Sequence, residues 1–235
     1  MTAADGPGGV SRVHWMEQVH GTDVITVAVA TDSTDAADST DSTGFIDSPG
    51  SLDASRSGAP PVTAVFAGDA DALVGKGPGS ALAVLTADCG SIALGSAEGV
   101  FAAVHAGWRG LAGGVVEAAV AAMRERGATA VVGALGPCIH PECYEFSPHH
   151  LDQLAAVYGD AVRGRTAAGR PALDLPAAVS AALVAADATE VAGTVACTAC
   201  GGGYFSHRAR ADRGRQALVV WSRGRGDGGD PGDRA

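Results

Sequence analysis

Two histidines and one cysteine stand beside glycine-containing turns in this chain, and their side chains are ordinary ligands for zinc. His20 lies in Gln-Val-His-Gly at 18–21, Cys89 ends Thr-Ala-Asp-Cys at 86–89, and His105 opens His-Ala-Gly-Trp-Arg-Gly at 105–110. A catalytic zinc ion takes three protein ligands of these types and keeps a fourth position for water or substrate. The three residues are far apart in the sequence, so only the fold could bring them together. On residue types alone, separate structural roles are the simpler interpretation.

Each of the three residues has a possible structural role without a metal. The ring of His20 could bond to backbone within its turn. Cys89 could be a small buried hydrophobe, but the neighbouring Asp88 makes a poor core environment. His105 ends an apolar run as a core histidine can, yet it is followed by Gly107, whose missing side chain lets a ligand approach the backbone.

Short apolar runs separated by glycine or polar residues predict strands at 81–86, 91–94, 100–104 and 130–135. Cys89 and His105 would then follow strand ends. Helical spacing at 111–126, closed by Gly127, predicts a helix whose start carries Arg109. Backbone N–H groups and the dipole favour an anion there, so Arg109 is the best predicted phosphate binder; a salt bridge is its alternative role.

The second half of the chain carries further element signals. Ser147 and Asp174 are predicted N-caps of helices that run to about 158 and 186. Strands are predicted at 191–196, 204–208 and 217–221. This mixture of hairpin-like strands and helices predicts an α/β fold with mixed sheets.

Composition limits the function classes. The 235 residues, 46% of them hydrophobic, fit a single catalytic domain over 1–222, interrupted by an acidic, disordered insertion at about 31–59 and followed by a disordered tail at 223–235. The net charge of −10 argues against a nucleic-acid partner. The absence of a leader and of a long apolar run predicts a cytoplasmic protein without a membrane partner.

Five cysteines in such a chain are better explained as reduced thiols or ligands than as a disulfide framework. Cys197 and Cys200 form a Cys-x-x-Cys pair, which Cys138 and Cys143 could extend to a four-thiolate zinc site. Four residues separate Cys138 from Cys143, not two, so free thiols are the favoured interpretation.

The motifs, in their order along the chain, resemble those of the YfiH-type laccase-domain family. They are Gln-Val-His-Gly at 18–21, Asp-Ala-Leu at 71–73, Thr-Ala-Asp-Cys at 86–89, His-Ala-Gly-Trp-Arg-Gly at 105–110, Gly-Pro-Cys-Ile at 136–139, Cys-Tyr-Glu at 143–145, Cys-Thr at 197–198, Tyr-Phe-Ser-His-Arg at 204–208, Gly-Arg at 214–215 and Trp221. The resemblance implies stacked β-sheets flanked by helices, with a zinc ion on His20, Cys89 and His105.

The same resemblance implies a purine nucleoside phosphorylase acting on adenosine, inosine, guanosine or methylthioadenosine with phosphate, and an adenosine deaminase activity. Gln18 and Asp88 would orient a ligand histidine or simply bond to backbone. The alternatives are a copper-dependent polyphenol oxidase, for which one three-ligand site is a poor basis, a hydrolase that edits peptidoglycan precursors, and an inactive homologue. The inactive homologue is considered because only 17 residues precede Gln18 in this sequence, whereas members of the family have several dozen more at this point. The oligomeric state is left open.

Overall fold

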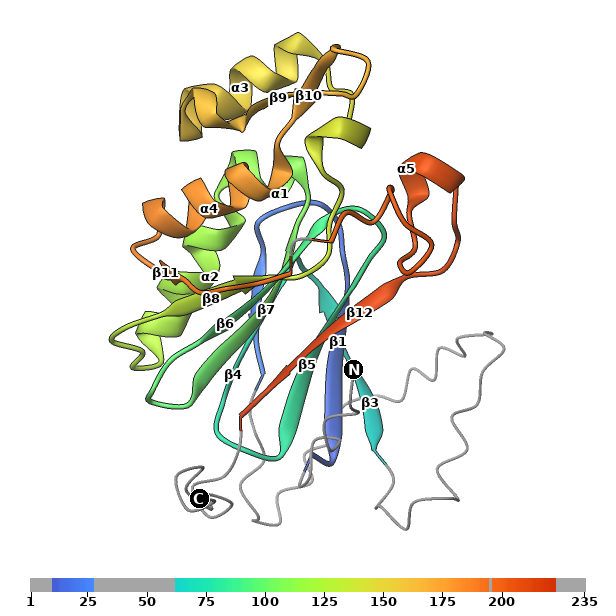
Figure 1. Ribbon diagram of the computed structural model, residues 1–235. Helices are drawn as coiled ribbons and strands as arrows, with labels where there is room; N and C mark the ends of the chain where they lie inside the picture. Colours follow the sequence, from blue (N-terminus) through green and yellow to red (C-terminus); the bar gives the residue numbers. More distant parts are fainter. Residues whose placement is uncertain (1–9, 28–61, 195, 223–235) are drawn as a thin grey trace, which may run out of the picture.

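Two β-sheets pack face to face, and helices cover the outer face of the larger sheet (Figure 1). The computed structural model describes residues 10–27, 62–194 and 196–222. Within them the smaller sheet has the strand order β12-β5-β1-β3. Its strands are β1 (Arg12–Glu17), β3 (Thr63–Asp69), β5 (Ser80–Thr86) and β12 (Gln216–Trp221). The mixed α/β fold predicted from the sequence is confirmed.

The larger sheet has six strands in the order β11-β8-β6-β7-β4-β2 within the same residues. They are β2 (Val24–Thr26), β4 (Ala72–Lys76), β6 (Gly90–Gly95), β7 (Val100–Ala106), β8 (Val132–Leu135) and β11 (Thr189–Glu190). A hairpin of β9 (Arg163–Arg165) and β10 (Pro171–Leu173) lies apart from both sheets. The helices are α1 (Trp108–Gly113), α2 (Val115–Glu125), α3 (Pro148–Tyr158), α4 (Leu175–Ala185) and α5 (His207–Arg210).

The central strand β7 is buried on both faces, which explains why its sequence is a continuous apolar run. Val104 and the residues at even positions pack among the helices, whereas Phe101 and Ala103 pack between the two sheets. Successive side chains of a strand point to opposite faces. His105 therefore faces the four-stranded sheet, at the carboxyl end of its strand.

Three chain crossings between the sheets lie at the same edge. Strand β1 pairs in parallel with both β3 and β5, so the carboxyl ends of these three strands meet there. After each of them the chain passes to the other sheet, from β1 to β2, from β3 to β4 and from β5 to β6. Because β7 runs antiparallel to β4 and β6, its carboxyl end reaches this edge as well.

Most of the predicted elements are confirmed. Strands β5, β6, β7 and β12 lie where the apolar runs predicted them, and β8 covers the last four residues of 130–135. The side chains of Ser147 and Asp174 accept hydrogen bonds from backbone N–H groups as N-caps of α3 and α4. The predicted helix at 111–126 is instead two helices, α1 and α2, because Gly114 between them adopts a left-handed conformation with φ of 87°.

Two predicted strands are wrong. At 191–196 the described residues form no regular strand beyond β11, although Val191 and Thr194 donate single hydrogen bonds to β8. At Gly193 the backbone comes so close to Leu135 that a side chain there would overlap it. At 204–208 Ser206 accepts a hydrogen bond from Ala209 N–H and starts α5 instead.

The predicted insertion at 31–59 and tail at 223–235 lie outside the described residues. In the part of the chain that the structure does describe, no helix is both long and apolar enough to cross a membrane.

Candidate metal centre

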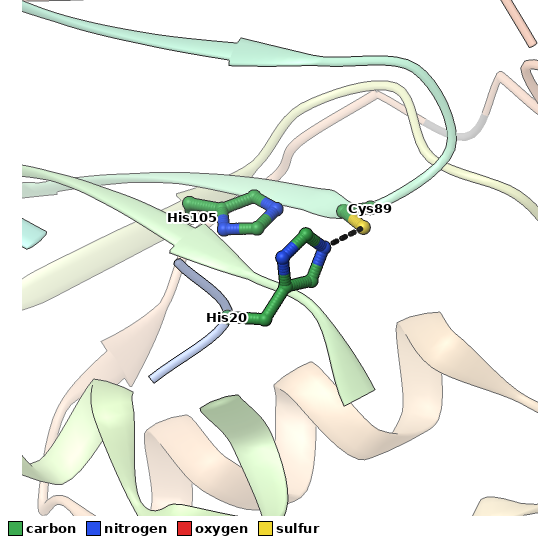
Figure 2. Close-up of side chains that lie close together, drawn as sticks. All are labelled: His20, Cys89 and His105. Carbon is green, nitrogen blue, oxygen red and sulfur yellow. Dashed lines mark hydrogen bonds between the residues drawn. The ribbon is translucent and has the colours of Figure 1, made fainter. Parts of the chain in front are cut away.

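The shared edge of the sheets gathers the three predicted metal ligands. His20 lies on the crossing from β1 to β2, Cys89 on the crossing from β5 to β6, and His105 in β7. One ligand atom from each lies within 4.8 Å of the other two. Figure 2 shows the two imidazole rings and the thiol converging on one point. The fold thus brings together residues that are up to 85 positions apart in the sequence.

The spacing of these atoms fits a metal ion. Zn–S and Zn–N bonds of the usual length at a tetrahedral angle place sulfur and nitrogen about 3.6 Å apart. Nε2 of His20 lies 4.0 Å from Sγ of Cys89, and the centroids of the two imidazole rings are 4.8 Å apart at an interplanar angle of 86°. Small side-chain movements would close the site on zinc. The donor set of two imidazoles and a thiolate suits zinc.

Asp71 completes the site and was not assigned a role from the sequence. Its Oδ1 lies 2.8 Å from Nδ1 of His105, and both side chains are buried. An ionised carboxylate only accepts hydrogen bonds, so Nδ1 carries the proton and Nε2 is left to face the metal position. The signal in the sequence was a carboxylate placed immediately before the apolar run of β4.

Asp71 also holds the His20 turn. Its Oδ1 and Oδ2 accept hydrogen bonds from the backbone N–H groups of His20 and Gly21, at 3.0 and 2.5 Å. His20 itself adopts a left-handed conformation with φ of 60°, which is uncommon for a residue with a side chain. One carboxylate therefore fixes the orientation of one ligand ring and the backbone of the other.

The charges of the cluster favour a bound cation. Burial alone would raise the pKa of Asp71, but hydrogen bonds from His105 and from the backbone of Gly21 and His20 hold it below its ordinary value. Burial alone would also raise the pKa of Cys89, yet hydrogen bonds with His105 and His20 lower it to about 6. Against burial, Asp71 and Cys89 raise the pKa of His105 to about 9. Without metal, Asp71 and Cys89 are thus anions beside a protonated His105, and a metal cation would take the place of the proton on Nε2.

Gly107 leaves the space in which these side chains meet. A Cβ atom at this position would lie 2.9 Å from Cδ2 of His20 and 3.5 Å from Sγ of Cys89. The backbone angles of Gly107 are ordinary for any residue, with φ of −73° and ψ of 161°. Space beside the ligands, not backbone conformation, therefore requires glycine here.

The cluster opens into a pocket of about 550 Å³. Ligand pockets for small molecules have volumes of roughly 300 to 1,000 Å³. The pocket is lined by the three ligands together with residues of β1 and β5 in the four-stranded sheet and of the C-terminal segment, among them Gln18, His207 and Arg215. His207 and Arg215 lie in motifs of the sequence to which no role was assigned, and both residues line the pocket.

Gln18 and Asp88 both bond to backbone. The side-chain amide of Gln18 donates to the carbonyl of Leu85 and accepts from its N–H, at 2.7 and 2.9 Å, which ties β1 to β5. The carboxylate of Asp88 accepts two hydrogen bonds, one from the hydroxyl of Thr198 at 2.7 Å and one from the backbone N–H of Arg208 at 2.6 Å. Asp88 thereby attaches the C-terminal segment to the turn that carries Cys89.

Arg109 is not part of the pocket wall. It is the second residue of α1, its side chain is exposed, and its guanidinium carbon lies 4.7 Å from the centroid of the Trp108 ring. Its predicted role in phosphate binding stays a prediction. Arg215, in contrast, lines the pocket, and its Nη1 donates to the backbone carbonyls of residues 212–214 at 2.9 to 3.1 Å.

Curated relatives of this chain have names that describe nucleoside chemistry. A purine nucleoside phosphorylase of Streptomyces coelicolor is 38% identical over 214 residues, which cover 90% of this chain and 75% of that protein. A purine nucleoside phosphorylase of Mycobacterium tuberculosis is 34% identical over 94% of this chain and 76% of its own length. An adenosine deaminase, RL5, from an unknown prokaryotic organism is 36% identical over 55% of this chain and 53% of its own.

This chain is also similar to solved structures and matches one family model. A Neisseria meningitidis protein superposes with a TM-score of 0.67 at 28% identity, covering 92% of this chain and 76% of its own. YlmD from Geobacillus stearothermophilus gives a TM-score of 0.66 at 28% identity, over 91% and 74%. The model of the multi-copper polyphenol oxidoreductase laccase family matches residues 3–223. The chain therefore belongs to this laccase family, the YfiH-type family that its motifs resemble.

Proposed function

We propose that this protein is a zinc-dependent purine nucleoside phosphorylase with adenosine deaminase activity. The observation that carries the proposal is the convergence of His20, Cys89 and His105 at the wall of a pocket of about 550 Å³. The names of the relatives support purine nucleosides as the substrate class. The donor set of two imidazoles and one thiolate suits zinc and also occurs in blue-copper sites. The choice of zinc rests on the nucleoside chemistry in the names of the relatives, which needs an open Lewis-acid site and no electron transfer.

The residues of the chain have distinct tasks in this proposal. His20, Cys89 and His105 hold the zinc ion, and Asp71 fixes the tautomer of His105 and the turn of His20. When bound, zinc supplies a Lewis acid that polarises a substrate atom and lowers the pKa of water. Deamination needs such an activated water, whereas phosphorolysis needs inorganic phosphate held beside the sugar.

The phosphate needs a cation in the pocket, and Arg215 is better placed for this than Arg109. Arg215 lines the pocket together with His207, and backbone carbonyls hold its guanidinium in place. A pre-positioned guanidinium binds phosphate oxygens with little further ordering cost. Arg109 lies over the ring of Trp108, outside the wall.

The experiment is a product analysis with and without phosphate. Zinc-loaded protein is incubated with inosine and with adenosine, and the products are separated by chromatography. We expect free base only when phosphate is present, and inosine from adenosine in both conditions. The variant Cys89→Ala should lose zinc and both activities, while Cys138→Ala, at a buried cysteine outside the metal centre, should keep both.

Two results would overturn the proposal. One is fully zinc-loaded wild-type protein that forms neither free base nor inosine. The other is copper-loaded protein that oxidises phenols while the zinc form is inert, which would support the oxidase alternative.

A further inference from the structure

A second group of sulfur atoms lies away from the metal centre. Sγ of Cys143, Cys197 and Cys200 are all within 4.8 Å of one another, and the first and last are 3.2 Å apart. Cys143 ends the 3₁₀ turn Pro141–Cys143, Cys197 forms an isolated β-bridge with Cys138, and Cys200 lies in the turn that follows it before α5. Free thiols were the favoured interpretation of the sequence for Cys138, Cys143, Cys197 and Cys200. The structure brings the last three together and leaves Sγ of Cys138 outside the group.

This group lies in an unusual place for cysteine. Cysteine is among the most buried residue types, because its thiol behaves as a small hydrophobe. Here Cys200 is exposed, while Cys143 and Cys197 are partly exposed. Cys143 packs against the edge of the apolar core, but core packing does not account for the exposed Cys200 or for three thiols from two separate segments that meet at one point.

We propose that Cys143, Cys197 and Cys200 bind one structural zinc ion as thiolates. Zn–S bonds of the usual length at a tetrahedral angle place sulfur atoms about 3.8 Å apart, within the 4.8 Å spread of this group. Sγ of Cys143 and Sγ of Cys200 need to separate by about 0.6 Å, from 3.2 Å to about 3.8 Å, to fit. On binding, the three thiols release their protons to solvent and the sulfur lone pairs form the metal bonds.

The carboxylate of Glu142 lies outside the group of atoms that are within 4.8 Å of one another, and it would supply the fourth ligand once its side chain turns toward the sulfur atoms. Its Oε1 lies 3.6 Å from Sγ of Cys200 and 3.8 Å from Nδ1 of His140. A structural zinc site is closed by four protein ligands. Glu142 precedes Cys143 in the 3₁₀ turn, so one short turn provides two ligands and the segment before α5 provides the other two.

A zinc ion here would anchor the segment that completes the pocket. The hydroxyl of Thr198, between two of the cysteines, donates to Asp88, and the backbone N–H of Arg208 donates to the same carboxylate. His207 lines the pocket in the same segment. The anchored segment is otherwise short of apolar burial, since α5 has no buried residues. The inference concerns this separate site and does not depend on the proposed activity.

The test is metal content in reducing buffer after growth with zinc, measured by elemental analysis. We expect about two zinc ions per wild-type chain, and about one in either Cys89→Ala or Cys200→Ser. Glu142→Gln should bind the second zinc more weakly, measured by competition with a chelator. Cys138→Ala is the matched control, since its backbone is the bridge partner of Cys197 but its sulfur lies outside the group; it should keep the wild-type content.

Cobalt gives a readout that does not depend on activity. In Cys89→Ala the cysteine of the pocket is absent, so cobalt should still produce the strong sulfur-to-metal charge-transfer absorption of a three-thiolate site. Adding Cys200→Ser should weaken that absorption and shift it. Zinc content unchanged by Cys200→Ser, or a disulfide between Cys143 and Cys200 in place of the metal, would overturn the inference.

Discussion

Asp71 and His105 form a hydrogen bond of 2.8 Å between Oδ1 and Nδ1, in which the two side chains are only 1% and 3% exposed. Because the bond is buried, solvent cannot replace the carboxylate if it is removed. The proton that it holds on Nδ1 leaves Nε2 of His105 for a metal. The ligand geometry of the whole centre therefore depends on a residue that is not a ligand.

The variant Asp71→Asn should bind zinc about 10- to 100-fold more weakly, in line with the usual effect of removing such an orienting partner. An amide has one acceptor oxygen, so it cannot serve His105 and both N–H groups of the His20 turn. Competition with a chelator measures the affinity. Asp69→Asn, at an exposed aspartate at the end of β3, is the control. Equal affinities in both variants would contradict the role of Asp71.

Gly107→Ala should weaken zinc binding without unfolding the protein. The added Cβ would lie 2.9 Å from Cδ2 of His20, so the ring must move, whereas the backbone angles of Gly107 suit alanine. The same chelator competition, paired with thermal unfolding of the metal-free protein, separates the two effects. Gly95→Ala is the control, because a Cβ there meets nothing within 4 Å. A similar loss of zinc in both variants would show that crowding at His20 is not the cause.

The sequence predicted the ligands better than the residues that arrange them. Strands β5, β6 and β7 are strongly apolar because one or both of their faces are buried. The apolar runs in the sequence therefore predicted these strands and placed Cys89 and His105 at strand ends. Strand β3 is mostly exposed and was not predicted. Without β1 and β3, the parallel arrangement that brings three crossings to one edge could not be derived. Asp71 lies on one of those crossings, so its role was missed although its motif was noticed.

Local signals also competed with one another near the C-terminus. The apolar run at 191–196 predicted a strand, but close backbone contact at Gly193 decides the conformation there. By its residue type, Ser206 could belong to a strand or cap the start of a helix. In the structure its hydroxyl oxygen accepts a hydrogen bond from the backbone N–H of Ala209, so it is the N-cap of α5. Such outcomes depend on tertiary contacts that periodicity does not contain.

Arg215→Ala should impair the use of phosphate more than Arg109→Ala does. Arg215 lines the pocket and Arg109 does not, so only the first should contact the anion. Loss of a charge-assisted hydrogen bond of about 1.5 to 3 kcal/mol corresponds to a decrease of roughly 10- to 150-fold in kcat/KM for phosphate. The measurement varies phosphate at saturating inosine. A larger effect of Arg109→Ala would locate the anion at the start of α1 instead.

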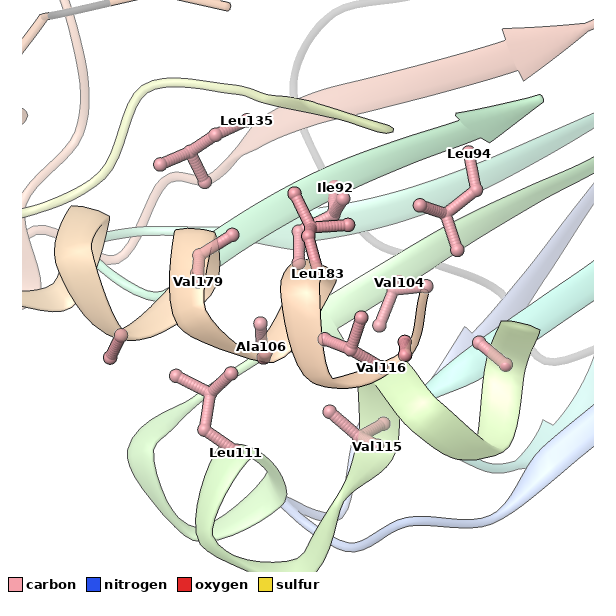
Figure 3. Packing of buried hydrophobic residues seen from close by; sticks show 14 of the residues in the cluster. Ile92, Leu94, Val104, Ala106, Leu111, Val115, Val116, Leu135, Val179 and Leu183 are labelled. Atoms are coloured by element: carbon pink, nitrogen blue, oxygen red, sulfur yellow. The ribbon is translucent and has the colours of Figure 1, made fainter. Parts of the chain in front are cut away.

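Leu183→Ala should destabilise the fold by about 2 to 5 kcal/mol, because it leaves a cavity in a packed core. Figure 3 shows Leu183 of α4 and Ile92 of β6 in the same packed cluster, and both side chains are fully buried. The neighbouring Val184 is 75% exposed, so Val184→Ala should change stability by less than about 0.5 kcal/mol. Urea unfolding of the metal-free protein compares the two. Equal midpoints would mean that α4 contributes little to the stability of the six-stranded sheet, contrary to its position in the core.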